Sequence, residues 1–418
     1  MSFKTLFALL SLVLATSASA SAAAAASAAS AASASAADSA LPARADVLKK
    51  MRAVNDYFMA EWPDVGKPIV TNRSRPSNIW TRGVYYEGLM EFWRLERDPR
   101  LLDYAVRWGD AHKWSLRNFK HPNGGTTHNA DDQCAGQTYI ELWQVDPRPE
   151  RIHDIKANID AMLERPQNTD WWWIDALQMA MPVYAKLGAI AIERAERDGR
   201  DGRDSAAAGR KYFEKMHALY LNTKNEQGGS GLFNAADGLW WRDASFVPPY
   251  KTPNGKDCYW SRGNGWVVVA LTRTLDSLPD TPATAAYRAE YTAMLKTMCE
   301  ALRKIQRDDG FWNASLADPG HFGGKETTGT SLFTAGMAWG VRHGVLDRAT
   351  YGPVIARAWA AMANEAVHAN GFLGYVQGTG KEPKDGQPVT RDSKPDFEDY
   401  GAGCFLIAGA ELCKLMAK

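Results

Sequence analysis

The stretch TDWWWIDALQMAMP, residues 169–182, sets one carboxylate, Asp175, among three tryptophans and a run of apolar side chains. Apolar surroundings disfavour the ionised form of a carboxyl group and raise its pKa, so that a proton is retained near neutral pH and can be donated to a substrate. The other interpretation is an acid in the first turn of a helix that begins near Ile174, where the helix dipole favours the ionised form. The stretch therefore predicts either a general acid or a helix-terminal carboxylate at Asp175.

A second group of acids lies in HNADDQCAGQTYIELW, residues 128–143, where Asp131 and Asp132 come directly before a predicted helix. Both can serve as helix-capping residues. Alternatively, one of them faces Asp175, and two carboxyl groups in one cavity then separate their pKa values, so that one is protonated while the other is ionised. Such a pair suits acid and base catalysis on a water molecule and a sugar. Asp132 is favoured because it is one step nearer the helix, and Asp131 is the alternative.

The segment YWSRGNGW, residues 259–266, places Arg262 between Trp260 and Trp266. The guanidinium of Arg262 offers a planar fork for a carboxylate, and Gly263 allows a close backbone approach. A helix start alone would not require an arginine between tryptophans, so ligand binding is the favoured interpretation and a simple helix start the alternative. The segment is not a dinucleotide-binding motif, because G-x-G-x-x-G and its preceding strand are missing.

Two polar segments nearer the C-terminus are further candidates. In HFGGKETTGTSLF, residues 321–333, Thr327 and Thr328 can cap a helix or bind the hydroxyl groups of a ligand. Residues 377–397 form a long polar loop, which is either a lid over the site or a solvated insertion. The chain also holds 16 tryptophans and 15 tyrosines, whose flat faces suit sugar rings, although large cores use them too.

These candidates must be positioned by helices and by the loops between them. The segment AEYTAMLKTMCEALRKI, residues 289–305, carries its apolar side chains in one stripe at spacings of three and four, which predicts an amphipathic helix. The segment HDIKANIDAMLER, residues 153–165, has the same pattern. Alternating strand patterns are scarce and short. The fold class predicted from these patterns is all-α.

A weak internal repeat makes the architecture more specific. A Gly-aromatic segment, a polar loop, a glycine-containing turn and an apolar helix recur, with Gly265, Gly329 and Gly401 separated by 64 and then 72 residues. Helical hairpins at such a period predict a closed or curved array of helix pairs. The loops would then gather at one end, over the N-termini of the apolar helices, where free N–H groups and positive dipole ends suit an anionic ligand.

The first forty residues have the composition of a leader. Lys4, an apolar run over residues 6–15 and the small residues 18–20 form the layout of a signal peptide, and the apolar run is too short to span a bilayer. The Ala/Ser-rich residues 21–40 have too little bulky apolar surface to pack. We therefore expect a signal peptide over residues 1–20, a disordered leader over 21–40, one domain over 41–418, and export to a periplasm or beyond.

The net charge and the cysteines exclude several classes of function. A formal net charge of +1 gives no electrostatic signal for nucleic acid or for an anionic membrane surface. The five cysteines include no C-x-x-C pair, so the sequence predicts neither a zinc site nor a disulfide framework.

Four motifs taken together resemble a known family. WWWIDALQMAMP, NADDQCAGQ, WSRGNGW and GGKETTGTSLF occur in the order found in the unsaturated glucuronyl and rhamnogalacturonyl hydrolases of glycoside hydrolase family 105, which is related to family 88. The resemblance extends from about Asp46 to the C-terminus. It implies an (α/α)6 barrel, and it implies an enzyme that needs no metal, no nucleotide and no covalent nucleophile.

The resemblance also implies a reaction and a set of residues. The family's substrates carry a Δ4,5-unsaturated uronic acid at the non-reducing end; an aspartic acid protonates C4 and helps deliver water to C5, and the resulting hemiketal opens and releases the sugar. Asp175 resembles the family's general acid/base and Asp132 its partner aspartate. The positions that match residues contacting or lining the substrate are Trp173, Met179, Trp260, Arg262, Gly263, Trp266 and Thr327.

The sequence departs from the best-known family members at groups expected to contact the uronate carboxylate and the following sugar. Arg242 stands where they tend to carry a histidine, Arg82 stands where they often have Trp-x-Tyr, and MLERPQN replaces a His-Lys pair. Additional arginines would suit a more anionic or differently linked substrate. The expected state is a monomer or small homo-oligomer.

Two other hypotheses remain open at this point. A polysaccharide lyase or sugar epimerase could use the same barrel, although such enzymes need a His, Tyr or Lys base near a ring C–H, and the motifs here centre on carboxylates. An exported sugar-binding protein without catalysis is the third hypothesis, and the presence of both acids argues against it.

Overall fold

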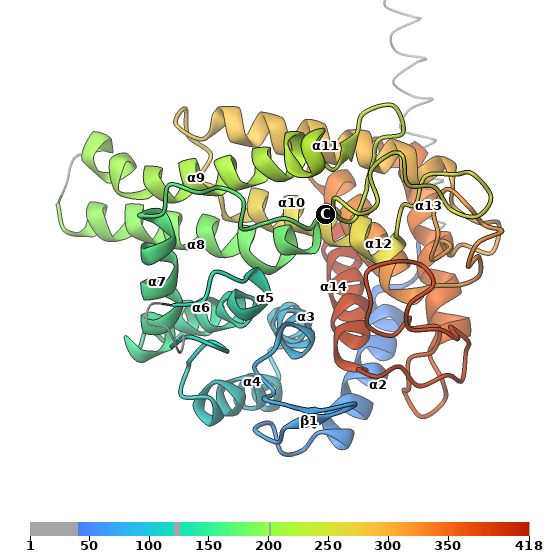
Figure 1. Ribbon diagram of the computed structural model, residues 1–418. Helices are drawn as coiled ribbons and strands as arrows, with labels where there is room; N and C mark the ends of the chain where they lie inside the picture. The colour runs from blue at the N-terminus through green and yellow to red at the C-terminus, as the bar shows by residue number, and fades with distance from the viewer. Residues whose placement is uncertain (1–40, 121–125, 200–201, 418) are drawn as a thin grey trace, which may run out of the picture.

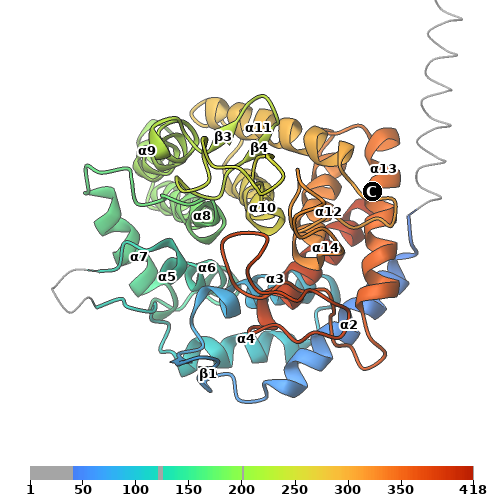
Figure 2. The ribbon, with the colours of Figure 1, turned by 45° about the vertical axis from the view of Figure 1, so that its right-hand side comes forward.

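The computed structural model describes residues 41–120, 126–199 and 202–417, and it is a barrel of helix pairs (Figures 1 and 2). The signal peptide and the leader predicted for residues 1–40 lie outside the described residues. Six helices form an inner ring. They are α3 (Trp80–Glu96), α6 (Ala135–Val145), α8 (Asp175–Arg197), α10 (Ser261–Ser277), α12 (Thr327–Arg342) and α14 (Asp399–Met416).

The inner helices contact one another in the order α3, α6, α8, α10, α12 and α14, and α14 returns to contact α3, so the ring is closed. Six further helices pack outside the ring: α2 contacts α14, and each of the others contacts the inner helix that precedes it in sequence. They are α2 (Arg44–Glu61), α4 (Pro99–Ala111), α7 (Glu150–Leu163), α9 (Gly202–Asn225), α11 (Ala285–Lys304) and α13 (Arg348–Ala361). The predicted all-α class and the (α/α)6 barrel are confirmed.

The two layers differ in how their residues are buried. In α12 every residue from Thr327 to Val341 is buried, as expected for a helix enclosed on all sides. The outer helix α7 instead buries a stripe that includes Ile152, Ile155, Ile159 and Met162. Inner helices therefore need small residues at their crossings: a Cβ on Gly88 of α3 would lie only 2.4 Å from the carbonyl oxygen of Gly403 of α14.

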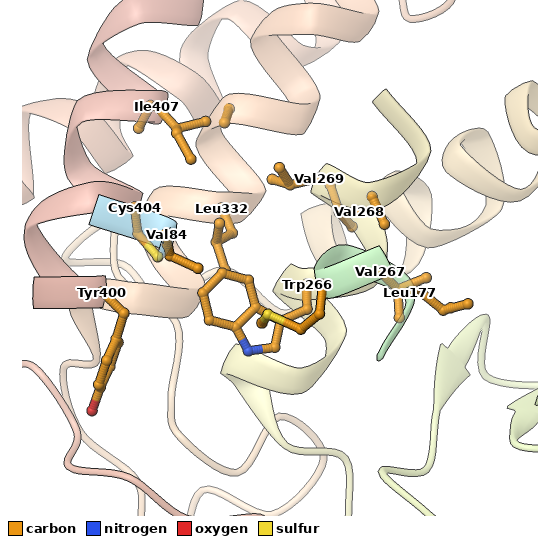
Figure 3. Close-up of a cluster of buried hydrophobic side chains, with 14 of the residues drawn as sticks. Val84, Leu177, Trp266, Val267, Val268, Val269, Leu332, Tyr400, Cys404 and Ile407 are labelled. Carbon is orange, nitrogen blue, oxygen red and sulfur yellow. The ribbon is translucent and has the colours of Figure 1, made fainter. Parts of the chain in front are cut away.

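The core inside the ring is built from several inner helices at once (Figure 3). The indole of Trp266 from α10 is fully buried, and Figure 3 shows it in a cluster with Val84 of α3, Leu177 of α8, Leu332 of α12 and side chains of α14. Burial of a large aromatic side chain among aliphatic groups stabilises the fold by roughly 2 kcal/mol. This cluster holds the inner helices in register.

The glycines of the sequence repeat occupy equivalent places. Gly265, Gly329 and Gly401 all lie in the first turns of inner helices, α10, α12 and α14. A Cβ at each would collide with a neighbouring element, for example at 2.0 Å from the hydroxyl oxygen of Ser261 in the case of Gly329. The repeat therefore marks the positions where inner helices begin and approach closely.

Short elements join the helices at the end of the barrel where the inner helices begin. The hairpin β1 (Ile69–Val70) and β2 (Ser74–Arg75) is antiparallel, with Ile69 opposite Arg75, and the hairpin β3 (Phe233–Asn234) and β4 (Leu239–Trp240) is antiparallel, with Phe233 opposite Trp240. The other short elements are α5 (Ala130–Gln133), the 3₁₀ turn η1 (Gln227–Gly229) and the π-helical turn η2 (Met362–Ala366). None of the described helices is both long and apolar enough to cross a membrane.

Candidate active site

A cavity of about 290 Å³ opens at the end of the barrel where the inner helices begin. Its wall includes the first turn of α3, the helix α5, the first turns of α8, the β1–β2 hairpin and part of the loop 377–397. Two carboxylates, Asp131 and Asp175, line it together. Four arginines also line it: Arg73, Arg75, Arg117 and Arg242. The described lining thus combines acids with guanidinium groups and aromatic rings.

Asp175 is the first residue of α8, and its side chain is almost fully buried. The backbone N–H of Ile174 donates to the carbonyl oxygen of Arg242 at 3.0 Å, which sets the strand-like segment after β4 beside the start of α8. Arg242 Nε then donates to Asp175 Oδ2 at 3.2 Å. Burial raises the pKa of Asp175, and the positive charge of Arg242 opposes that rise. Burial is the larger of these two effects, so the pKa of Asp175 lies above the usual value of an aspartic acid.

Asp131 lies in α5, a four-residue helix capped by Asn129, whose side chain accepts from the backbone N–H of Asp131 at 2.8 Å. Burial and the negative charge of Asp175 raise the pKa of Asp131 to about 7, while Arg242 and Arg117 act in the opposite direction. Because the charge of one carboxylate shifts the pKa of the other, the two groups titrate as a pair. The cavity therefore contains two carboxyl groups, those of Asp175 and of Asp131, which was the alternative partner in the sequence.

Asp132, which the sequence favours as the partner of Asp175, lies outside the cavity lining, and Asp131 takes the place expected for it. The Asp132 carboxylate accepts from Thr127 Oγ1 at 2.7 Å and from Asn118 Nδ2 at 3.2 Å, and it does not line the cavity. A step of one residue along a helix turns the side chain by about 100°. Asp131 consequently faces Asp175, and Asp132 is turned toward the segments around it.

Trp173 and Met179, predicted next to Asp175, both line the cavity. Trp173 is held by a β-bridge to Asp243, the residue after Arg242. Trp172 points outward with 51% of its surface exposed, and its ring lies 4.5 Å from that of Trp173. The tryptophan run therefore supplies one ring to the cavity and one to the outside of the molecule beside it.

Arg262 and Trp260 lie behind the cavity wall instead of on its surface. Arg262 is fully buried, and its two terminal nitrogens donate to the carbonyl oxygens of Gln377 and Gly378 at 2.8 and 2.7 Å. Its guanidinium also lies over the rings of Trp260 and Tyr400. Trp260 Nε1 donates to the side-chain oxygen of Gln377 at 2.9 Å. Both residues hold the start of the loop 377–397 in place.

Three other residues predicted to contact substrate are also buried away from the cavity lining. Gly263 packs against the ring of Trp260 and the side chain of Ile174, and Trp266 belongs to the core of Figure 3. Thr327 Oγ1 donates to the carbonyl oxygen of Gly374 at 2.8 Å. In this structure the Arg-Trp turn and Thr327 support the cavity wall from behind. Their polar groups are bonded to backbone carbonyl oxygens or buried in the core, and so do not reach the cavity.

The loop 377–397 forms part of the wall, which favours a cover over the site and not a solvated insertion. Thr379, Gly380 and Phe397 line the cavity. The side chain of Gln377 donates to the carbonyl oxygen of Asp385 at 2.7 Å, and Tyr400 donates to the carbonyl oxygen of Gln377 at 2.5 Å. The loop is therefore tied both within itself and to α14.

Sequence reasoning missed three of the lining arginines. Arg73 and Arg75 belong to the β1–β2 hairpin, and Arg117 follows α4. Their position in loops before inner helices α3 and α6 was the available signal, because such loops converge at one end of the barrel. Arg82, which the sequence did single out, is instead buried against Asp399 at 3.2 Å and the ring of Trp62.

The cysteine and acidic side chains give no sign of a metal centre in the parts of the chain that the structure describes. No group of three or more His, Cys, Asp or Glu side chains there could hold a metal ion. The five cysteines are all buried as free thiols. The chemistry available in the described lining is that of carboxyl groups, guanidinium groups and aromatic rings.

Comparisons with known proteins agree on a carbohydrate-active barrel. A sequence profile of glycosyl hydrolase family 88 matches residues 50–416. An unsaturated 3S-rhamnoglycuronyl hydrolase from Formosa agariphila is 32% identical over 359 residues, which cover 80% of this chain and 84% of that protein. A family 88 glycosyl hydrolase from Bacteroides vulgatus has a TM-score of 0.76 and 29% identity, covering 90% of this chain and 100% of that one. A structure described as a polysaccharide lyase has a TM-score of 0.76 and 30% identity, covering 90% and 99%.

The helical barrel is thus shared with a family 88 glycosyl hydrolase and with a structure described as a polysaccharide lyase. The chain belongs to glycosyl hydrolase family 88, and it is a glycoside hydrolase that acts on oligosaccharides bearing an unsaturated uronic acid. The resemblance to families 105 and 88 predicted from four motifs is confirmed. The roles of the individual site residues stay predictions.

Proposed function

We propose that the enzyme removes a Δ4,5-unsaturated uronic acid from the non-reducing end of lyase-generated oligosaccharides, with rhamnoglycuronyl oligosaccharides as the first substrates to examine. The names of two relatives, from Formosa agariphila and from an Alteromonas species, support this substrate class. The observation that carries the proposal is the pair Asp131 and Asp175 in one cavity, with a pKa near 7 for Asp131. A pair of carboxyl groups that still holds one proton near neutral pH can supply that proton as a general acid. When the proton is on Asp175, Asp131 is ionised and can act as the base.

The proposed reaction is a hydration. Asp175 gives its proton to C4 of the enol ether, positive charge develops at C5, and water adds there while Asp131 accepts a proton from that water. The product is a hemiketal that opens and releases the sugar, so no glycosyl–enzyme bond forms. The separation rule for retaining and inverting carboxylate pairs consequently does not apply.

In this proposal Arg242 pairs with Asp175 in the free enzyme and binds the uronate carboxylate in the complex. Before substrate binds, it donates to Asp175 and, through Nη1, to Asp243 at 2.8 Å. The uronate carboxylate is attached to C5, the carbon to which water adds, and so it lies close enough to the site of reaction to compete with Asp175 for the guanidinium. When the substrate carboxylate takes Arg242, Asp175 loses its cationic partner, its pKa rises further, and it becomes the better proton donor.

The lyase and epimerase alternative is disfavoured by the side chains of the cavity. One structural neighbour is described as a polysaccharide lyase, which keeps the alternative in view. Abstraction of a ring proton is expected to need His, Tyr or Lys, and none of these is among the described residues that line the cavity. Carboxyl and guanidinium groups fit the addition of a proton and a water better than the removal of a proton from carbon.

The test is the loss of near-UV absorbance from defined unsaturated disaccharides of pectin, ulvan and glycosaminoglycan origin. Hydration destroys the conjugated acid, so the absorbance should disappear on at least one substrate, and Asp175→Asn should slow this by about a thousandfold. Gain of absorbance on saturated polysaccharide would favour a lyase. Persistent absorbance with every uronate, or full activity of Asp175→Asn, would contradict the proposal.

The leader supports export as a second part of the proposal. Residues 1–20 have the signal-peptide layout described above, and a single domain would follow the Ala/Ser-rich segment 21–40. Mass spectrometry of the protein recovered from each cell fraction tests this. A mature N-terminus near residue 21 in a periplasmic or extracellular fraction is expected, and an intact Met1 in the cytoplasmic fraction alone would contradict it.

A further inference from the structure

Asp243 lies beside Arg242 but outside the cavity lining, and its carboxylate is fixed by its neighbours. The Asp243 backbone forms a β-bridge with Trp173. Its Oδ1 accepts from the backbone N–H of Ser245 at 2.9 Å and from the Ser245 hydroxyl. Because Asp243 is buried behind the cavity wall, it would influence the reaction through Arg242 and through its own charge and not by contact with substrate.

Asp243 carries its negative charge at neutral pH. Burial alone would raise the pKa of this carboxyl group, but hydrogen bonds from Ser245 and Arg242 outweigh burial and hold the pKa below the usual value of an aspartic acid. Arg242 therefore has two acidic partners in the free enzyme, Asp175 inside the cavity and Asp243 behind it.

The two acids bind different parts of the Arg242 guanidinium. Asp175 accepts from Nε at 3.2 Å, and Asp243 accepts from Nη1 at 2.8 Å. In a guanidinium group Nε and Nη2 share one edge, from which two parallel N–H bonds reach both oxygens of a carboxylate, and Nη1 keeps further N–H groups outside that edge. A carboxylate bound along the Nε–Nη2 edge would therefore displace Asp175 and leave Asp243 in place.

We propose that Asp243 is a positioning residue, which anchors Arg242 at Nη1 while the Nε–Nη2 edge passes from Asp175 to the uronate carboxylate of the substrate. This inference rests on the function proposed above. The anchor keeps the guanidinium in the cavity wall during the exchange. It also neutralises part of the positive charge, so that Arg242 holds Asp175 less strongly than an arginine with one acidic partner would.

The charges that face Asp175 come from three segments, and they fix the sign of the expected effect. Burial is the largest influence and raises the pKa of Asp175, Arg242 and Arg262 lower it, and Asp243 raises it. Asp131 of α5 also raises it when ionised, because the two carboxyl groups interact. Neutralising Asp243 therefore lowers the pKa of Asp175. The other guanidinium groups of the cavity are unchanged in all variants below, and they belong to Arg73, Arg75 and Arg117.

The experiment compares Asp243→Asn with the matched control Asp309→Asn. Asp309 also pairs with the preceding arginine of its turn, Arg307, at 2.8 Å and accepts from a backbone N–H two residues later at 3.2 Å, but it is remote from the cavity lining. On one unsaturated disaccharide, Asp243→Asn should move the alkaline limb of kcat to lower pH by about one unit, so that kcat above the limb falls about tenfold. Asp309→Asn should keep the limb of the wild type and change kcat less than about twofold.

A second background separates positioning of Arg242 from support of the turn. In Arg242→Gln, the further change Asp243→Asn should alter kcat/KM less than about twofold, because the group that Asp243 anchors is gone. An equal loss in both backgrounds, or a lower kcat with an unmoved limb, would overturn the proposal. If Asp243→Asn does not fold, Asp243→Glu and Asp243→Gln repeat the comparison with side chains of matched length. Of these two, only Asp243→Glu should keep the wild-type limb, and equal limbs would overturn the proposal.

NMR of enzyme labelled at the carboxyl carbon of aspartate gives a readout without turnover. The Asp175 signal is assigned by its loss in Asp175→Asn, and its titration midpoint should lie at lower pH in Asp243→Asn than in the wild type. An unmoved midpoint would overturn the proposal even where substrate is turned over. A moved midpoint without turnover of any unsaturated uronate would contradict only the proposed reaction.

Discussion

Asp131 and Asp175 differ in the groups that stabilise their negative charge. Asp175 accepts from Arg242, whereas no guanidinium lies within ion-pair distance of Asp131 in the described structure. In the free enzyme a proton shared by the pair is therefore held mainly by Asp131, whose pKa is about 7. Binding of a uronate to Arg242 would raise the pKa of Asp175, so that the shared proton would then be held mainly by Asp175. The donor would then become active only when substrate is in place.

The first prediction concerns the alkaline limb of the pH profile. Activity needs a proton on the pair, so kcat/KM should be full below the raised pKa and fall as pH rises through about 7. Asp131→Asn removes the negative charge beside Asp175 and so lowers the pKa of Asp175, which should move the alkaline limb to lower pH. The variant also lacks the base that accepts a proton from water, so the rate should fall by about a hundredfold.

The control for this prediction is the neighbouring acid. Asp132→Asn keeps a hydrogen-bonding side chain beside Thr127 and Asn118 and does not touch the cavity, so it should lose less than about tenfold and keep the limb of the wild type. Initial rates from pH 5 to 9 on one unsaturated disaccharide measure both variants. An Asp132→Asn limb shifted like that of Asp131→Asn would contradict the assignment.

Two choices, Asp131 against Asp132 and ligand binding against support for Arg262, show what a sequence leaves open at this scale. Asp175 could be found because three tryptophans in a row make a carboxylate conspicuous. The choice between Asp131 and Asp132 depends on the phase of a four-residue helix, which no pattern of apolar residues fixes. Arg262 between two tryptophans looks the same in sequence whether its guanidinium meets a ligand or two backbone carbonyls. A buried donor needs acceptors in either case, and the structure supplies them from residues 377 and 378.

At the scale of elements, the loop 377–397 is fixed by the first turns of three inner helices. Arg262 of α10 and Tyr400 of α14 donate to it, and the backbone N–H of Gln377 lies 3.4 Å from a carboxylate oxygen of Glu326, which caps α12. The helix starts were predictable from periodicity and from the recurring glycines. The contacts by which these helix starts hold one loop were not predictable. Trp260 and Arg262 bond to Gln377, which is more than 100 positions away in the sequence.

The second prediction tests whether these hydrogen bonds hold the loop in place. Arg262→Met has a similar volume but leaves the carbonyl oxygens of Gln377 and Gly378 without their donors, which should cost about 1–3 kcal/mol of stability. The loop should loosen, so that KM rises about tenfold while kcat changes less. Lys384→Gln, an exposed change in the same loop, should alter neither quantity. Urea unfolding, KM and limited proteolysis within residues 377–397 measure these effects, and an unchanged KM would show that the loop does not depend on Arg262.

At the scale of the whole molecule, the two ends of the barrel have different charge arrangements. Among the described residues, the end with the cavity has guanidinium groups without an ion-paired acid, whereas the opposite end holds a buried cluster in which acids and bases are paired. There Glu87, Glu91 and Glu141 from α3 and α6 meet Arg273 of α10 and Lys186 of α8 around a second hollow of about 360 Å³. In the ring order, α10 stands opposite α3, so Arg273 joins helices across the barrel axis.

Closure of the ring is the feature that the sequence showed least directly. The repeat predicted a closed or curved array of helix pairs, and the family resemblance implied the closed (α/α)6 barrel. The contact that closes the ring, between α3 and α14, joins residues about 300 positions apart, as in the pair Gly88 and Gly403, and no local pattern predicts it. Closure brings the first and last inner helices together, and so it forms the cavity at one end of the barrel and the charged cluster at the other. The residues that span the barrel interior should therefore affect the stability of the whole domain more than the chemistry at one end.

The last prediction follows from that placement. Arg273 Nη2 donates to Glu141 at 2.9 Å, Nε to the Gln137 side chain at 3.1 Å, and Nε lies 3.6 Å from Glu87. Arg273→Met leaves these buried carboxylates without a main counter-charge, which should destabilise the domain by about 3–5 kcal/mol, whereas Arg303→Met in an exposed pair should cost less than about 1 kcal/mol.

The pH dependence distinguishes lost charge compensation from lost packing. Burial already raises the pKa of Glu87 to about 7 with Arg273 present, and removal of the guanidinium raises it further. A carboxyl group whose folded pKa is raised contributes stability below its unfolded pKa and loses it as pH rises through the folded value. Urea unfolding should therefore show a larger deficit of Arg273→Met at pH 8 than at pH 5, with KM near the wild-type value where the variant is folded. A deficit equal at both pH values would mean that the guanidinium fills space at this end of the barrel and does not compensate its acids.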